Sequence, residues 1–122
     1  MKLETIQQNG QTVAVMTSGT PVMTDVQSAL DLLMTARYEA GTNRIAIEKA
    51  AVAEAFFVLS TRLAGEILQK FINYQGKLAV YGDFSHYTSK PLRDFIYESN
   101  QGRDVFFVET KEEAVERLAS AK

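Results

Sequence analysis

The sequence predicts an α/β fold with a mostly parallel five-stranded sheet and an N-terminal hairpin, in the order ββαβαβαβα. From residue 24 onward, short apolar β-type segments alternate with segments of helical periodicity. Such alternation requires crossover connections, which make neighbouring strands parallel. At the start of the chain, Asn9 and Gly10 separate two β-type segments, and this pair suits the positive φ angles of a type I′ turn. The hairpin therefore adds one antiparallel strand.

The boundaries of the elements follow from capping and turn residues. The predicted strands are short and rich in apolar or β-branched residues: Leu3–Gln8, Thr12–Met16, Arg44–Glu48, Leu78–Tyr81 and Val105–Val108. The first helix is expected to begin at Thr24 or Asp25 and to stop at Gly41. One stripe of that helix carries Val26, Ala29, Leu30, Leu33 and Arg37.

The stretch Ala51–Gln75 keeps helical spacing throughout. A single helix of that length would extend for roughly 37 Å, about the full width of a compact domain of this size. We therefore expect a break near Leu59–Thr61, with a short helical turn before it and the main helix after it. Gly76 is expected to end the main helix.

Two further helices are predicted near the C-terminus. Ser89 or Lys90 begins the first, with Pro91 in its first turn and Gly102 at its end. For the second, which runs through Leu118, the capping-box pattern is formed by Thr110 and Glu113. Two aromatic pairs are expected in the core: Phe56-Phe57 and Phe106-Phe107.

Composition excludes several classes of function. Residues 1–122 are expected to form a single domain with a core, since 46% of them are hydrophobic. The net charge of −2 provides no broad basic surface for nucleic acid or anionic membranes. There is no cysteine and only one histidine, so we expect no metal and no cofactor. The acidic start Met1–Glu4 and the short apolar runs predict a cytoplasmic protein without a signal peptide or membrane span.

The loop Gly82–Pro91 is the first candidate site. It follows a buried strand and leads into a helix, which is where open α/β sheets bind ligands. It is also longer than the roughly two to six residues that such a connection needs. Its candidate ligand- or anion-binding residues are polar or charged: Asp83, Ser85, His86, Thr88, Ser89 and Lys90. Arg93, one turn further on, adds a second cation.

A hydrolase interpretation of the same loop would use Asp83, Ser85 and His86. Three such residues within four positions are too close along the chain to line up as orienter, nucleophile and base. No G-x-S-x-G elbow is present either. Asp83 and Ser85 are better explained by local turn hydrogen bonds, and no residue is assigned a catalytic role.

Carboxylates also follow the predicted strands at the same edge of the sheet. In chain order they are Asp25, Glu48, Asp83 and Glu109. They would form a cation or acid/base site if they converged. Alternatively, they cap a helix or end strands in solvent, and the sequence leaves both readings open.

Three stretches carry a resemblance to a known family: Thr24–Leu32, Leu63–Phe71 and the run from Gly82 to Tyr97. They are similar to the bacterial family catalogued as domain of unknown function 4180, and the likeness extends over essentially the whole chain. The resemblance implies a shared fold and no defined activity.

The order of elements also resembles that of STAS domains, the anti-sigma-factor antagonist type, which makes a STAS-like domain the expected architecture. In that family a Ser/Thr pair begins the helix after the buried middle strand, a place held here by Ser60 and Thr61. Leu59 stands where an aspartate usually precedes the pair, and Arg62 where a glycine usually follows. The resemblance implies a phosphorylation switch at Ser60 or Thr61, with Arg62 able to pair with the phosphate. The alternative is a plain N-cap.

Together these features favour a non-enzymatic regulatory or protein-interaction module whose partner is another protein. No nucleic acid or membrane partner is expected, and formation of a homo-oligomer stays open. The alternative is a small-ligand or anion-binding domain that uses the loop Asp83–Lys90.

Overall fold

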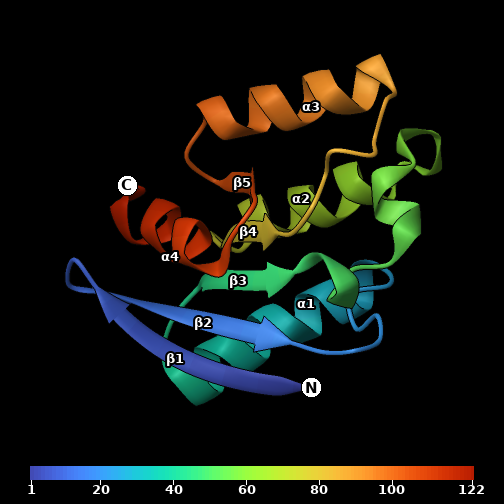
Figure 1. Cartoon of the computed structure of the whole chain (residues 1–122). Coiled ribbons are helices and arrows are strands. Elements are labelled where there is room, and N and C mark those ends of the chain that lie inside the picture. Colours follow the sequence, from blue (N-terminus) through green and yellow to red (C-terminus); the bar gives the residue numbers. More distant parts are fainter.

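A computed structural model describes all residues, 1–122, and contains one five-stranded sheet in the order β1-β2-β3-β4-β5 (Figure 1). The strands are β1 (Lys2–Gln8), β2 (Gln11–Thr17), β3 (Arg44–Glu48), β4 (Lys77–Tyr81) and β5 (Val105–Val108). β1 pairs antiparallel with β2, and β2 to β5 are all parallel. The predicted fold class is therefore confirmed.

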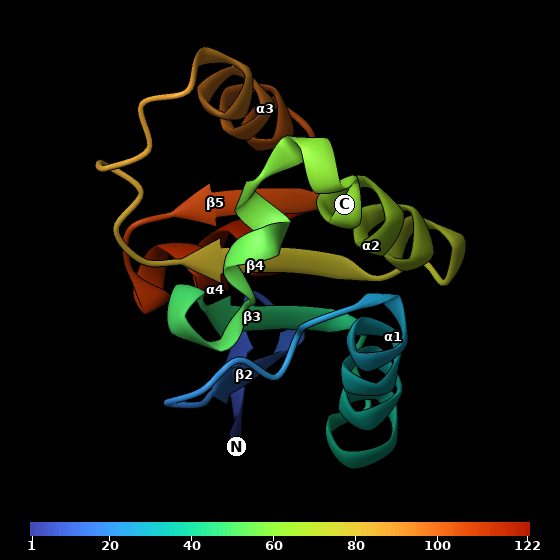
Figure 2. The same cartoon turned by 90° about the vertical axis from the view of Figure 1, so that its right-hand side faces the viewer.

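The helices cover both faces of this sheet. They are α1 (Val26–Thr35), α2 (Leu63–Asn73), α3 (Lys90–Gln101) and α4 (Lys111–Ser120). Parallel strands in chain order, joined by right-handed crossovers, put α1, α2 and α3 on one face. α4 lies on the other face, as Figure 2 shows. None of these helices has the length and apolar character needed to cross a membrane.

Two apolar clusters fill the space between the sheet and its helices. The larger has 22 buried residues on the α1–α3 face and includes Phe56, Phe57 and Phe107. The smaller has nine, lies under α4 and includes Phe106. The predicted burial of both aromatic pairs is confirmed. Apolar runs in the strands follow from a sheet that is covered on both faces.

The predicted hairpin and first helix are also confirmed. Asn9 and Gly10 both have positive φ, 52° and 75°, as a type I′ turn requires. Asp25 caps α1 by accepting the Ser28 N–H at 2.7 Å. A π-helical turn, Ala36–Ala40, extends α1 and ends at Gly41, whose φ is 65°.

Between β3 and α2 the chain forms three short 3₁₀ turns: Lys49–Ala51, Glu54–Phe57 and Leu59–Thr61. The predicted break near Leu59–Thr61 is therefore confirmed. The predicted role of Gly76 is wrong, because α2 ends at Asn73 and Gln75 takes the positive φ of 59°. Gly76 is needed for space instead: a Cβ there would lie 3.0 Å from side-chain atoms of Leu33 and of Phe71.

The last two helices begin as predicted. Ser89 caps α3 by accepting the Leu92 N–H, and Gly102 follows its last residue. Thr110 caps α4 by accepting the Glu113 N–H at 3.1 Å. The reciprocal half of the capping box differs, since the Glu113 carboxylate accepts the Thr110 hydroxyl.

Candidate functional site

Two segments meet at the carboxyl edge of the parallel strands. One is the pair of 3₁₀ turns that precedes α2, and the other is the loop that leads into α3; Figures 1 and 2 show these turns beside the start of α3. The Tyr87 hydroxyl donates to Glu54 Oε1 at 2.8 Å. The rings of Phe57 and Tyr87 stack with 5.4 Å between their centroids. These contacts join residues some thirty positions apart in the chain.

Between the two segments lies a hollow of about 630 Å³, which we call the edge groove. Its apolar lining consists of Phe57, Val58, Leu59, Pro91 and Leu92. The polar lining consists of Glu54, Ser60, His86, Tyr87, Thr88 and Ser89. The lining is therefore mixed, with apolar side chains beside polar ones, and the volume is in the usual range of protein binding sites.

Lys49 packs against the two aromatic rings that line the edge groove, those of Phe57 and Tyr87. Its Nζ lies 5.0 Å from the centroid of the Tyr87 ring and 5.5 Å from that of Phe57. The Glu54 carboxylate is 4.0 Å from the same nitrogen, and only 19% of the lysine side chain is exposed. A cation held over two ring faces, next to an acid, keeps these groups in place.

Gly82 makes room for this lysine. A Cβ at position 82 would lie 2.7 Å from Lys49 Cβ, closer than real Cβ atoms approach, and the φ of Gly82 is 156°. The first residue of the loop after β4 is thus fixed as glycine by Lys49, which directly follows β3.

The pKa values of Tyr87 and Asp83, both in the loop at this edge, are shifted. Burial, and then the hydrogen bond to the Glu54 carboxylate, raise the pKa of the Tyr87 phenol, so its hydroxyl remains a donor. Hydrogen bonds from the Ser85 hydroxyl and N–H, at 2.6 and 2.8 Å, lower the pKa of Asp83. The predicted local turn bonds of Asp83 and Ser85 are confirmed. The Ser85 hydroxyl is directed at Asp83 and not at His86, so the serine–histidine pair of the hydrolase interpretation is not formed.

The structure distributes the candidate loop residues over three hollows. His86, Thr88 and Ser89 line the edge groove together with Ser60. Asp83 lines a neighbouring hollow of about 440 Å³ with Glu48 and Lys49.

Ser85 lines a third hollow, of about 580 Å³, between the loop and α3. Lys90 lines none of these three hollows. Its ammonium pairs with the Asp94 carboxylate at 2.6 Å on the exposed surface of α3.

The Ser60–Arg62 segment is placed differently from the expected helix start. Ser60 is exposed in the last 3₁₀ turn, three residues before α2. The Thr61 hydroxyl donates to the carbonyl oxygens of Ala55 and Val58, at 2.7 and 2.8 Å. Arg62 occupies the N-cap position in a left-handed conformation, with φ of 65° and no side-chain cap. The expected position of Ser60 at a helix N-terminus is wrong, because the left-handed Arg62 turns the chain between Ser60 and the start of α2.

The four carboxylates that follow the strands do not form a cation site. Asp25 caps α1, and the hydrogen bonds from Ser28 lower its pKa. Glu48 accepts the Ser18 N–H at 2.8 Å, while Asp83 is bound to Ser85. No three histidine, aspartate or glutamate side chains gather in an arrangement that would hold a metal ion.

Sequence reasoning missed four residues whose mutual contacts join the two segments of the site: Lys49, Glu54, Phe57 and Tyr87. Lys49 could have been found from its position directly after β3, since the ends of parallel strands put this lysine at the same edge of the sheet as Asp83. Glu54 and Phe57 gave no such signal, because their 3₁₀ turns share the apolar spacing of the helix that follows.

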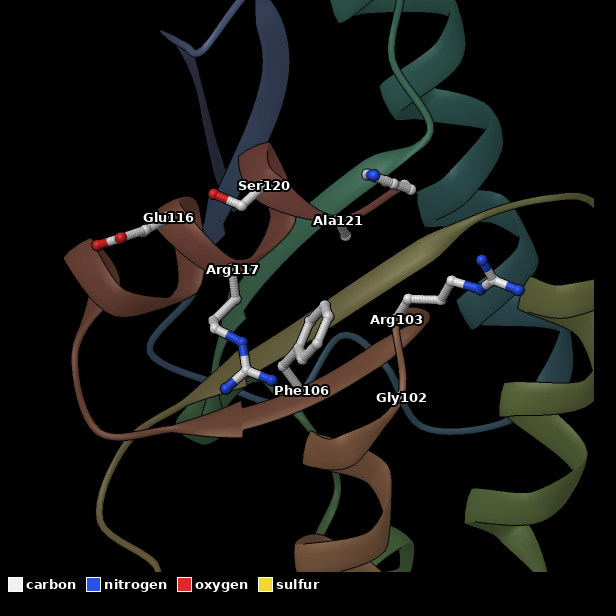
Figure 3. Close-up of a pocket in the computed structure, with 8 residues that line it drawn as sticks. Gly102, Arg103, Phe106, Glu116, Arg117, Ser120 and Ala121 are labelled. Carbon is white, nitrogen blue, oxygen red and sulfur yellow. The ribbon is translucent and has the colours of Figure 1, made fainter.

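A further hollow, of about 390 Å³, lies beside α4 and is shown in Figure 3. The Arg117 guanidinium lies 4.4 Å from the Phe106 ring centroid and donates to the Asn100 carbonyl near the end of α3. Glu116 and Arg103 point away from each other and from the hollow (Figure 3). Because Arg117 is bound to a helix-end carbonyl and Glu116 and Arg103 diverge, we assign no ligand to this hollow.

Comparison with known proteins assigns the chain to a family. It belongs to the family described as "Domain of unknown function (DUF4180)", whose model matches residues 8–118. This confirms the family resemblance of the sequence. The fold is similar to the crystal structure of a candidate anti-sigma factor antagonist from Thermotoga maritima, with 16% identity and a TM-score of 0.46. That similarity covers 94% of this chain and 91% of the other. A search among curated proteins finds no match.

Proposed function

We propose that this chain is a non-enzymatic, regulatory protein-interaction module that holds a segment of a partner protein in the edge groove. The observation that supports the proposal is the lining of that groove. Five apolar residues line it, and Val58 is 46% exposed although it is a large apolar residue. Exposed apolar surface of this kind marks interaction sites when it is continuous and has a polar rim.

The lining also suggests which partner segment would fit. Apolar side chains would pack against Val58, Leu59 and Pro91, while the hydroxyls of Thr88 and Ser89 would bond to the backbone of the segment. The one formally charged residue in the lining is Glu54, whose carboxylate is already engaged by the Tyr87 hydroxyl. The expected ligand is therefore an apolar, uncharged stretch of a protein.

Regulation by phosphorylation is part of this proposal, and Ser60 is its site. Ser60 is exposed and lines the groove, whereas the Thr61 hydroxyl is already bonded to two carbonyl oxygens. A phosphate on Ser60 would add nearly two negative charges beside the apolar wall and near Glu54. A partner segment would then lose affinity, and Arg62, two residues after the serine, is the cation that would pair with the phosphate.

A matched pair of variants tests the proposal. Val58→Asp places a carboxylate in the groove, while Ile72→Asp places one on α2 outside it, at a residue that is 50% exposed. An unpaired charge buried under a partner should reduce affinity at least about tenfold. A protein partner isolated with the parent chain should be retained by Ile72→Asp and lost by Val58→Asp. Equal retention by the two folded variants would contradict the proposal.

One observation favours a second function, the binding of a small anion. The hollow between the loop and α3 is lined by Arg93, Ser85, Thr88 and Tyr97, and no carboxylate lines it. An anion would pair with the Arg93 guanidinium and accept hydroxyl hydrogen bonds. NMR titration with inorganic phosphate would shift the signals of Thr88 and Tyr97 in the parent and leave them unchanged in Arg93→Gln. Identical shifts in both proteins would contradict this alternative.

A further inference from the structure

The two edges of the sheet are protected very differently. Figure 1 shows β1 at one edge and β5 at the other, with α3 beyond it. On the β5 edge, the Asn100 side chain donates to the Phe107 carbonyl at 3.0 Å and accepts the Phe107 N–H at 2.7 Å. This amide occupies the two backbone groups that an added strand would need. The β5 edge is therefore closed.

The β1 edge is open, and its outward groups follow from the hairpin register. With a two-residue turn, Gln8 and Gln11 exchange hydrogen bonds, so alternate residues of β1 bond to β2. The remaining residues, Leu3, Thr5 and Gln7, direct their N–H and C=O groups away from the sheet. The carbonyl of Thr12, opposite Gln7, accepts the Thr42 hydroxyl on the far side of β2, as this register requires.

β1 lacks the backbone features that would blunt this edge. Its seven residues pair one for one with β2, so there is no bulge, and none of them is proline. Natural sheets usually protect such an edge with a bulge, a proline, charged side chains or a covering segment. β1 has only charged side chains, Lys2 and Glu4, and these are of opposite sign. A strand with no bulge or proline is a surface for adding another strand whose charges match.

We propose that β1 pairs antiparallel with β1 of a second copy of this chain, about a two-fold axis at Leu3. Charge supports this partner and this register. Lys2 would lie directly opposite Glu4 of the second copy, and the arrangement would occur twice by symmetry. Lys2 makes no ion pair within the chain. Glu4 lies 3.5 Å from Lys111 Nζ, but 48% of its side chain is exposed, so its carboxylate is accessible to Lys2 of the second copy. Leu3, half-buried, would meet its own copy. Opposite charges and apolar residues across strands are favourable pairs.

This dimer would join the two sheets into one of ten strands. Its interface lies on β1, whereas the edge groove lies at residues 54–60 and 86–92, so the two surfaces are separate. Failure of the dimer would leave the groove proposal unaffected, and the reverse is also true.

A proline substitution tests whether the β1 edge forms the interface. The mass of the parent chain in solution, by light scattering or sedimentation up to about 100 μM, should rise to that of a dimer. Thr5→Pro removes an outward N–H that β2 does not use, so the fold should persist while the dimer is lost. Thr5→Val, which keeps the N–H, should remain dimeric. A monomeric parent, or a dimeric Thr5→Pro with native circular dichroism, would overturn the proposal.

Charge reversal tests the register. Lys2→Glu alone and Glu4→Lys alone each set like charges opposite one another at both symmetric positions, and each should weaken dimerisation about tenfold. A mixture of the two variants restores opposite charges at both positions and should form a heterodimer of near-parental affinity. If the two variants dimerise as the parent does, or if mixing restores nothing, the pairing about Leu3 is wrong.

Discussion

Replacing Gly82 by alanine should be strongly destabilising. The new Cβ would lie 2.7 Å from Lys49 Cβ, an atom fixed to the backbone at the end of β3 that no rotamer can move. Truncating Lys49 to alanine would not relieve the clash, because the same Cβ remains. Overpacking of this kind costs about 1–3 kcal/mol, and a backbone φ of 156° adds strain for any L side chain. We expect a loss of about 3 kcal/mol in the free energy of unfolding.

Urea denaturation of the parent and Gly82→Ala measures this loss, and thermal melting should show a drop of about 10 °C. Gly65→Ala is the matched control: no atom lies within 4 Å of its Cβ, and it sits in α2. It should stabilise the protein by about 0.5–1 kcal/mol, since alanine is the better helix former. A Gly82→Ala variant within about 0.5 kcal/mol of the parent would refute the reasoning that places Lys49 against the loop.

Three further predictions concern single side chains. Arg62→Gly should stabilise the protein by about 0.5–1 kcal/mol because it relieves a left-handed φ of 65°, and a lower melting temperature would contradict this. Asn100→Ala should cost about 2–3 kcal/mol in urea denaturation and speed amide exchange at Phe107, whose N–H it leaves unpaired; unchanged exchange would count against it. Ser85→Ala should raise the pKa of Asp83 toward its ordinary value of about 3.9 in a carboxyl NMR titration. An unshifted Asp83 pKa in the variant would refute the hydrogen-bond explanation. In the parent, the stability that this hydrogen bond gives should be present at neutral pH and disappear as the pH falls through the lowered pKa of Asp83.

Local signals predicted most of the fold. Asn9 and Gly10 define their turn by themselves, because the positive φ angles need no distant contact. The break at Leu59–Thr61 was predicted from the size limit of the domain, although periodicity alone would allow one long helix. The error at Gly76 has a different origin: a glycine after a helix is typical of a C-cap, and its actual role depends on packing against Leu33.

The candidate site was predicted only in part. The loop after β4 and Ser60 do meet in one groove, as the carboxyl-edge rule suggests. The groove itself depends on the bond between Tyr87 and Glu54, and no local pattern specifies that pairing. Lys90 was predicted to bind a ligand because it is a cation at the start of a helix, whereas in the structure its ammonium pairs with Asp94 one turn further along α3.

The most direct test of the central claim is photocrosslinking from the edge groove in living cells. A benzophenone side chain would replace Val58 in one chain and, as a control, Ile72 on α2 in another; both positions are exposed in the free protein. If the groove holds a partner protein, irradiation should yield one discrete adduct from position 58 and none from position 72. Adding Ser60→Glu to the position-58 chain should reduce that adduct. An adduct of equal yield from position 72, or none from position 58 while the partner still co-purifies, would contradict the account.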